Sequence, residues 1–150
     1  MKALLIVVLL LVTQMANALV TDRLMMVRSK QSFPETMSSL QEAIDLQGYK
    51  LSRVQRVDIG LTRSGYKTDK YRIVFFGKTD EMHRLSKQYP ELIPYLPLKV
   101  AIFAEGDETL LISANPRAFE KMYPQKDLQK VFEKWHKDIK HLLEFVQNAE

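Results

Sequence analysis

The stretch Tyr71–Gly77 reads YRIVFFG, and the rest of the chain can be placed against it. Its aromatic and β-branched residues carry a single charge, Arg72. They favour a strand, because such side chains fill a pleated surface that packs on at least one face. Gly77 and the polar residues after it end the pattern. We therefore expect Tyr71–Gly77 to be a central strand of a sheet.

Upstream of this strand, the sequence predicts a short strand and a well-delimited helix. The apolar run Arg23–Arg28 is long enough for one strand. Ser32 and Glu35 have the spacing of a capping box, and Gly48 supplies a left-handed stop. Between them, apolar residues recur at helical spacing and predict one buried stripe: Phe33, Met37, Leu40 and Ile44.

The segment before the central strand has the period of a strand with one interruption. Apolar residues alternate at Tyr49 and Leu51 and again in Val57–Leu61, but Val54 between them is out of phase. A bulge between residues 52 and 55 would absorb the extra residue, so we expect one bent strand here. Gly60 lies in its second half, where a missing side chain lets another backbone or a ligand approach closely.

Downstream of the central strand, a helical excursion leads into a hairpin. Thr79 is expected to cap a helix whose first turn carries two acidic residues. The three prolines of Tyr89–Pro97 then exclude a regular helix and predict an ordered crossing. Leu98–Phe103 and Thr109–Ser113 are expected to pair as a hairpin, which Asn115 ends.

The most periodic segment is Asp127–Asn148, which predicts a strongly amphipathic helix. Its apolar stripe is Leu128, Val131, Phe132, Trp135, Ile139, Leu142, Leu143 and Val146. Such a helix must cover a sheet or meet a partner, and Trp135 is expected to anchor the core. The order β, α, β, β, helical excursion, β, β, α predicts an α+β fold, with an antiparallel or mixed sheet covered by two main helices.

The amino terminus has the pattern of a secretory signal peptide. A basic start, an apolar run and small residues at positions 16 and 18 predict residues 1–18 as the signal, with cleavage between Ala18 and Leu19. The alternative is a membrane anchor, which needs about 20 apolar residues. Gln14 and Asn17 interrupt the run too early for that. We expect an exported protein, periplasmic in a bacterium or extracellular, with one α+β domain over residues 19–150 and no stable membrane span.

Charge and cysteine content limit the classes of partner. The formal net charge is +4, and the chain has no Cys, so no disulfide is expected. Basic residues gather around the central strand, at Arg53, Arg56, Arg63, Lys67, Lys70 and Arg72. Asp58 and Asp69 lie among them, and the aromatic interleaving of a nucleic-acid groove is thin. We expect a mildly basic solvated face and no nucleic-acid partner.

A Phe-Gly turn, a Leu-Pro step into a hairpin and an Asn-Pro close occur here as Phe76-Gly77, Leu96-Pro97 and Asn115-Pro116. In this pattern the residues from about 56 to 113 resemble the family catalogued as domain of unknown function 302. The resemblance implies one strand, one helix, four strands and a final helix, in an architecture related to the TATA-box-binding protein. It implies no common biochemical role.

Two departures from the family pattern affect the expected site. Members typically read Gly-Asn-Pro where this chain has Gly77-Lys78-Thr79. Many carry a His soon after the second strand starts, where this chain has Val57-Asp58-Ile59. If that His serves a ligand site, the resemblance implies that this protein lacks the activity or uses Asp58 instead.

Patterns that would name a reaction are missing from the sequence. The three His are His83, His136 and His141, and no two have the spacing of a helical metal site. Met82 beside His83 suits copper, but adjacent residues on a helix diverge. Neither the phosphate-loop nor the dinucleotide glycine pattern occurs. We therefore expect no cofactor, no metal and no catalytic residue, and favour a protein that is not an enzyme.

Three hypotheses for the function follow. The first is a non-catalytic binding or accessory module. Its small or anionic ligand is held on the sheet face or in a cleft near Asp58, Gly77, Lys78 and Asn115, because turn residues at strand ends commonly bind ligands. The second is a protein-interaction or assembly role, including a homodimer, through an exposed sheet edge or the helix that carries Trp135. The third is metal or redox handling by the Met and His residues.

Overall fold

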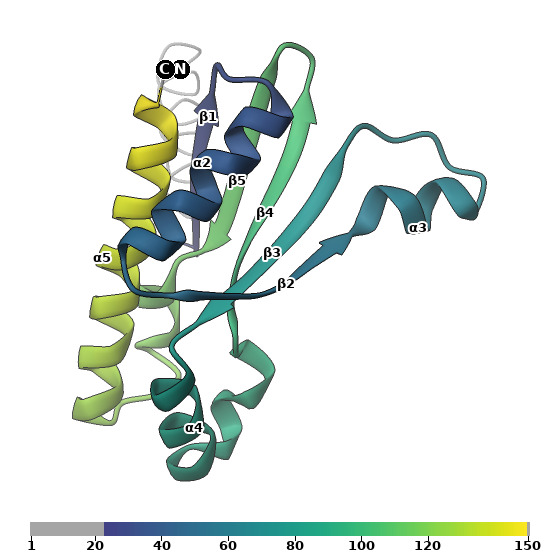
Figure 1. Ribbon diagram of the computed structural model, residues 1–150. Coiled ribbons are helices and arrows are strands. Elements are labelled where there is room, and N and C mark those ends of the chain that lie inside the picture. Colours follow the sequence, from purple (N-terminus) through teal and green to yellow (C-terminus); the bar gives the residue numbers. More distant parts are fainter. Residues whose placement is uncertain (1–22, 150) are drawn as a thin grey trace, which may run out of the picture. The chain divides into compact units, whose positions relative to one another are not determined.

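The computed structural model describes residues 23–149 (Figure 1). These residues fall into a larger unit, residues 26–113 and 137–149, and a smaller unit, residues 23–25 and 114–136. The predicted signal peptide and its cleavage between Ala18 and Leu19 lie outside the described residues. No helix within residues 23–149 is both long enough and apolar enough to cross a membrane.

The predicted α+β fold is confirmed, and its sheet is antiparallel. The strands are β1 (Leu24–Ser29), β2 (Lys50–Arg56), β3 (Tyr71–Gly77), β4 (Leu98–Glu105) and β5 (Glu108–Ala114), in the order β1-β5-β4-β3-β2. Neighbours from β2 to β5 pair antiparallel. Just beyond the ends of β1 and β5, the Asn115 N–H donates to the Arg23 carbonyl over 2.8 Å, as expected of antiparallel neighbours. The predicted central strand, β3, lies between β2 and β4.

The two faces of the sheet differ in burial. On one face, Val74 is paired with Val100 and both are fully buried, as are Phe76, Ile102 and Leu111. The opposite face carries apolar side chains that are only partly buried: Ile73, Phe75, Ala101, Phe103, Leu110 and Ile112. We call these six residues the open sheet face. Alternation along each strand produces the two faces, because successive side chains point to opposite sides.

Helices pack on the buried side of the larger unit. In α2 (Phe33–Leu46), Thr36, Leu40, Ala43 and Ile44 are buried, and the helix contacts β2 and β4. From residue 137 onward, α5 (Lys126–Asn148) buries Ile139, Leu142, Leu143 and Val146. The predicted start and stop of α2 are confirmed. The Glu35 carboxylate accepts hydrogen bonds from the Ser32 N–H at 3.0 Å and hydroxyl at 2.7 Å, and Gly48 has φ 70°.

The segment after β2 corrects one expectation. The predicted bulge is present between Leu51 and Arg53, but the strand ends at Arg56 and residues Val57–Arg63 form helix α3. Val57 and Leu61 are four residues apart, which suits a helix face as well as a strand face. No backbone approaches Gly60 closely, because a side chain added there would meet nothing within 4 Å, and the approach of a ligand stays a prediction.

The excursion after β3 consists of helix α4 (Thr79–Gln88) and the 3-10 helix η1 (Pro90–Tyr95). Thr79 is the first helical residue, and Lys78 occupies the cap position that was predicted for Thr79. Leu85 and Leu92 are buried, so the proline-rich crossing is ordered by packing.

The smaller unit contains the 3-10 helix η2 (Pro116–Phe119) and the first half of α5. Its core is aromatic: the Phe132 ring lies 5.7 Å from Phe119, 6.0 Å from Tyr123 and 5.9 Å from Trp135, between centroids. Trp135 is 2% exposed, so its predicted role as a core anchor is confirmed.

Candidate functional site

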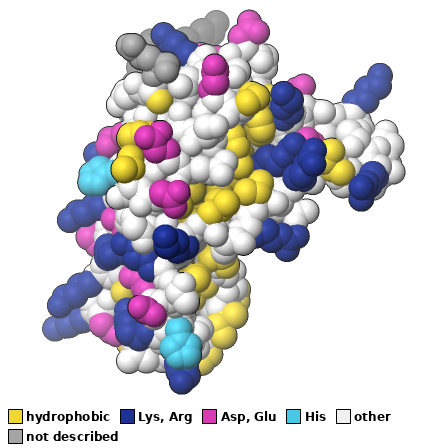
Figure 2. Space-filling model, viewed as in Figure 1, with side chains coloured by type: hydrophobic (Ala, Val, Ile, Leu, Met, Phe, Trp, Pro, Cys, Tyr) yellow, Lys and Arg dark blue, Asp and Glu magenta, His cyan; other side chains and the backbone are white. Residues whose placement is uncertain are grey.

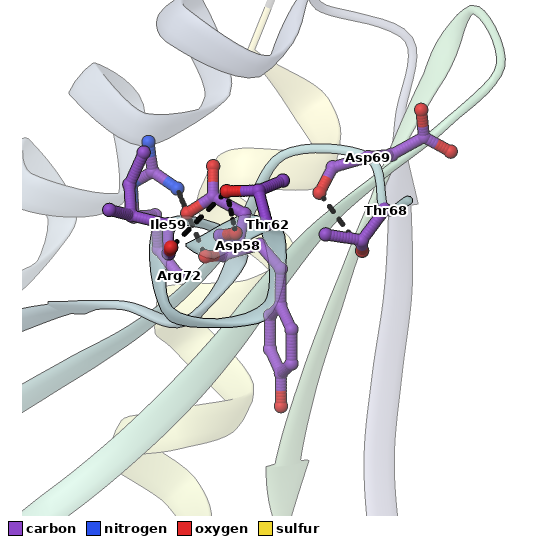
Figure 3. Close-up of polar contacts among 7 residues, drawn as sticks. Asp58, Ile59, Thr62, Thr68, Asp69 and Arg72 are labelled. Carbon is purple, nitrogen blue, oxygen red and sulfur yellow. Dashed lines mark hydrogen bonds and ion pairs between the residues drawn. The ribbon is translucent and has the colours of Figure 1, made fainter. Parts of the chain in front are cut away.

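Asp58 is held by an ion pair at the end of β2. It lies in the first turn of α3, and its carboxylate accepts from the Arg72 guanidinium of β3 (Figure 3). Both side chains are largely buried, with 12% of Asp58 and 14% of Arg72 exposed. The hydrogen bond from Arg72 keeps the pKa of Asp58 below its ordinary value. Its negative charge is therefore already compensated inside the protein.

Arg72 is fixed by more than this carboxylate. Its guanidinium also donates to the Tyr71 carbonyl over 3.0 Å, and its Cζ lies 5.8 Å from the centroid of the Phe33 ring, at the start of α2. The Lys70 Nζ lies 5.9 Å from the same ring. These cation–π contacts connect α2 to β3. The arrangement gives Asp58 and Arg72 a structural role that links three elements.

Gly77 and Lys78 lie at the opposite end of β3 from Arg72. In the β2–β3 register Arg72 is paired with Arg56, whereas Gly77 is paired with Lys50. Five residues along a strand correspond to about 16 Å. This corrects the expectation of one small cleft, because Asp58 and Lys78 are too far apart to line it together.

Gly77 allows close packing between β3 and α4. A Cβ added there would lie 2.5 Å from the Met82 Sδ and 2.9 Å from its Cε, far inside van der Waals contact. We expect Gly77→Ala to lower the free energy of unfolding by about 1 kcal/mol, since only the flexible end of Met82 must move. In a double-mutant cycle measured by urea unfolding, Met82→Ala should remove most of that cost. An equal cost of Gly77→Ala in the wild-type and Met82→Ala backgrounds would contradict the packing role.

Lys78 contributes to a buried polar cluster. Its Nζ lies 4.5 Å from the centroid of the Tyr49 ring. The Tyr49 hydroxyl donates to the Asp138 carboxylate over 2.5 Å, and the Gln47 amide donates to the Asp138 carbonyl over 3.1 Å. Burial, followed by the hydrogen bond to Asp138, raises the pKa of Tyr49 well above its ordinary range. The cluster joins the start of β2 to α5. Ligand binding by Lys78 stays a prediction.

Asn115 belongs to the smaller unit and caps η2. Its side-chain oxygen accepts from the Arg117 N–H over 3.1 Å and lies 2.9 Å from the His136 Nδ1. Arg117 in turn donates to both carboxylate oxygens of Glu133, over 2.7 and 2.9 Å. Asn115 is 6% exposed. It stabilises the turn after β5, and ligand binding by Asn115 stays a prediction.

Two clefts of the larger unit do not include the predicted site residues. One, of about 670 Å³, is lined by Arg28, Lys30, Gln31, Glu35, Gln147, Asn148 and Ala149. The other, of about 340 Å³, is lined by residues of the α2 start, the β3 start and the β4–β5 turn, including Phe33, Lys70 and Thr109. Both linings mix opposite charges. Within residues 23–149, no group of His, Cys, Asp or Glu could hold a metal ion.

The sequence predicted an interaction through a sheet face or a sheet edge without saying which residues form either surface. The structure provides the open sheet face and the outer edge of β2 as candidates. Tyr71–Gly77 is apolar in both parities, which is typical of a strand that is covered on both faces. That signal points to the open sheet face.

Comparisons with known proteins support the fold and leave the activity open. A family model described as "Domain of unknown function DUF302" matches residues 25–146. A crystal structure of an uncharacterized conserved DUF302 protein from Bacillus stearothermophilus is similar, with a TM-score of 0.74 and 18% sequence identity. The similarity covers 82% of this chain and 97% of that chain. At this identity it shows the shared fold alone. A search of curated proteins gave no match.

Proposed function

Because this chain belongs to the DUF302 family, whose description assigns no activity, we propose a function from its surfaces. It is an exported, non-catalytic interaction module that assembles with a second copy of itself through the open sheet face. The partly exposed apolar side chains of β3, β4 and β5 are the observation that carries this proposal. Contiguous apolar patches on a protein surface commonly mark interaction sites.

The open sheet face supplies the apolar centre of a dimer interface. Its three strands, about 4.8 Å apart and about 20 Å long, project an area on the order of 300 Å². The accessible area follows the side chains and is larger than this projection. Stable interfaces bury about 800 Å² on each partner. Side chains around the open sheet face must therefore contribute the rest of the contact.

A second copy fits this face because its centre is apolar and its rim carries both signs of charge. A two-fold contact places the same patch on both sides, which an apolar centre tolerates without charge complementarity. Around the centre, Lys99 and Arg53 are exposed cations, and Arg28 is paired with Glu105 over 2.9 Å. The helix face that carries Trp135 is buried inside its own unit and is not used in this proposal.

Two further observations support a non-catalytic, exported role. Asp58 and Asn115 form hydrogen bonds within the protein, and the Met82 side chain occupies the space beside Gly77. The amino-terminal pattern supports export. Nucleic acid is not part of the proposal.

Native mass spectrometry of the processed protein should report twice the mass of residues 19–150. An unprocessed mass would contradict export, and a reproducible added mass would favour the small-ligand hypothesis.

Replacing Ile73 in the middle of the open sheet face tests the dimer. Ile73→Glu should raise the dissociation constant of the dimer on the order of 100-fold or more, because a carboxylate would be buried without a partner. Sedimentation equilibrium measures this constant. Ile93→Glu is the matched control: Ile93 is 52% exposed on η1 and lies outside the open sheet face. A wild-type protein that stays monomeric at high concentration would overturn the proposal.

A further inference from the structure

The outer edge of β2 is the second surface that the function above does not use. β2 is the last strand in the sheet order, and within the described residues it pairs with β3 alone. An edge strand presents unpaired N–H and C=O groups that can hydrogen bond to another extended segment. Five of its seven residues, including Lys50 and Arg56 at its two ends, are exposed. The edge is therefore accessible to a partner.

The charge of β2 is entirely positive. Its sequence, KLSRVQR, carries Lys50, Arg53 and Arg56 and no acidic residue. Residues 47–70 contain six Lys or Arg and two Asp. Their net charge of +4 equals the formal net charge of the whole chain. One of those two, Asp58, is already paired with Arg72. Figure 2 shows the Lys and Arg side chains, in dark blue, on the part of the surface formed by β2 and α3.

These edge cations differ from three arginines elsewhere in the described chain. Arg28, Arg72 and Arg117 each form an ion pair with a carboxylate. Lys50 and Arg56 form no ion pair within residues 23–149, and the hydrogen bond from the Arg53 guanidinium goes to the neutral side chain of Gln55. Asp58, already paired with Arg72, also attracts Arg56, so the positive charge along the edge is only partly compensated within residues 23–149.

We propose that the outer edge of β2 binds an extended acidic segment of a partner protein, which adds to the sheet as a sixth strand. Main-chain hydrogen bonds then provide affinity, and side chains opposite β2 provide specificity. The cations of β2 oppose pairing between the edges of two copies, because like charges would face each other. The same cations attract a strand that carries carboxylates. The edge is thereby closed to self-association and open to an acidic partner.

The spacing along β2 defines the sequence that fits. From Arg53 to Arg56 the register with β3 is regular. These two side chains are three residues apart, so they lie on opposite faces of the sheet. An antiparallel partner strand therefore places carboxylates three residues apart to meet both. A residue between them faces Val54, which is partly buried, and favours an apolar side chain there.

A synthetic peptide provides the test. The probe is a short extended peptide with Glu at every third position and Val or Thr between, labelled for fluorescence anisotropy and titrated into the processed protein. Wild type is expected to bind it. Arg53→Glu/Arg56→Glu should weaken binding on the order of 100-fold, because two close charge pairs become repulsive. The matched control is Arg63→Glu/Lys67→Glu, which changes the same charge outside β2 and should weaken binding only a few-fold through long-range attraction.

A second probe separates strand addition from simple charge attraction. The same peptide with N-methylated alternate amides keeps every carboxylate but cannot complete the main-chain ladder, so it should lose binding. Equal binding of the methylated peptide, or equal competition by polyphosphate, would overturn the proposal, as would failure of the acidic peptide to bind. Arg56→Glu alone and the control Arg63→Glu/Lys67→Glu leave the open sheet face and its rim unchanged, so both should remain dimeric by sedimentation. Failure of this inference would therefore leave the proposed dimer intact.

Discussion

Asp58→Asn should lower the free energy of unfolding by about 3 kcal/mol, because it leaves the Arg72 guanidinium charged and largely buried without its carboxylate. Urea unfolding followed by circular dichroism measures the change. Asp69→Asn is the matched control, since Asp69 is exposed in the same segment and its replacement should cost less than about 0.5 kcal/mol. A cost for Asp58→Asn as small as that of the control would contradict the structural role of the pair.

Removing both partners should cost less than removing one. In Asp58→Ala/Arg72→Met, no buried charge is left alone, and the methionine can still pack on Phe33.

The stabilisation that Asp58 provides depends on pH with a defined sign. The pKa of Asp58 is lowered in the folded protein, so its stabilisation is present above pH about 4 and is lost as the pH falls through the lowered value. Asp58→Asn should reduce the loss of stability in acid.

Tyr49→Ala should lower the free energy of unfolding by about 4 kcal/mol, the usual cost of deleting a fully buried aromatic ring. Tyr49 is 1% exposed, and its ring meets Phe76 edge-to-face at 5.4 Å between centroids. Tyr49→Phe keeps the ring and removes only the hydrogen bond to Asp138, so it should cost about 2 kcal/mol. Equal costs for the two variants would show that the ring contributes nothing beyond its hydroxyl.

Tyr49 also predicts a loss of stability in alkali. Its pKa is raised in the folded state, so the folded protein retains the proton when the unfolded chain has released it. Stability should therefore fall as the pH rises above about 10, the ordinary value for tyrosine. Tyr49→Phe should flatten this slope relative to wild type. An unchanged slope would mean that other groups dominate the alkaline limb.

Local patterns predicted most of the elements. The strand Tyr71–Gly77, the capping box at Ser32 and Glu35 and the stop at Gly48 rest on interactions between near neighbours, so the sequence displays them directly. α3 was missed because Val57–Leu61 satisfies the periods of both a strand and a helix. The helix is compatible with Thr62, whose hydroxyl donates to the Asp58 carbonyl over 2.9 Å. No sequence pattern shows whether this local hydrogen bond stabilises a helix more than strand pairing would stabilise a strand.

The candidate site could not be assembled from the sequence. Residues at strand ends were grouped as one cleft, but pairing register decides which ends meet, and a turn pattern does not contain the register. Asp58 lies near Arg72, whereas Gly77 lies near Lys50. The residue types were informative in a different sense. Asp58, Gly77 and Asn115 are places where the fold needs a charge, an absent side chain and a cap.

The contact between Tyr49 and Asp138 joins residues that are 89 positions apart in the chain. During synthesis, the Tyr49 hydroxyl cannot meet this carboxylate until Asp138 has left the ribosome. Contacts of such long range delay folding relative to chain elongation. The nascent chain therefore keeps part of its core open, and accessible to chaperones and proteases, until helix α5 has been made.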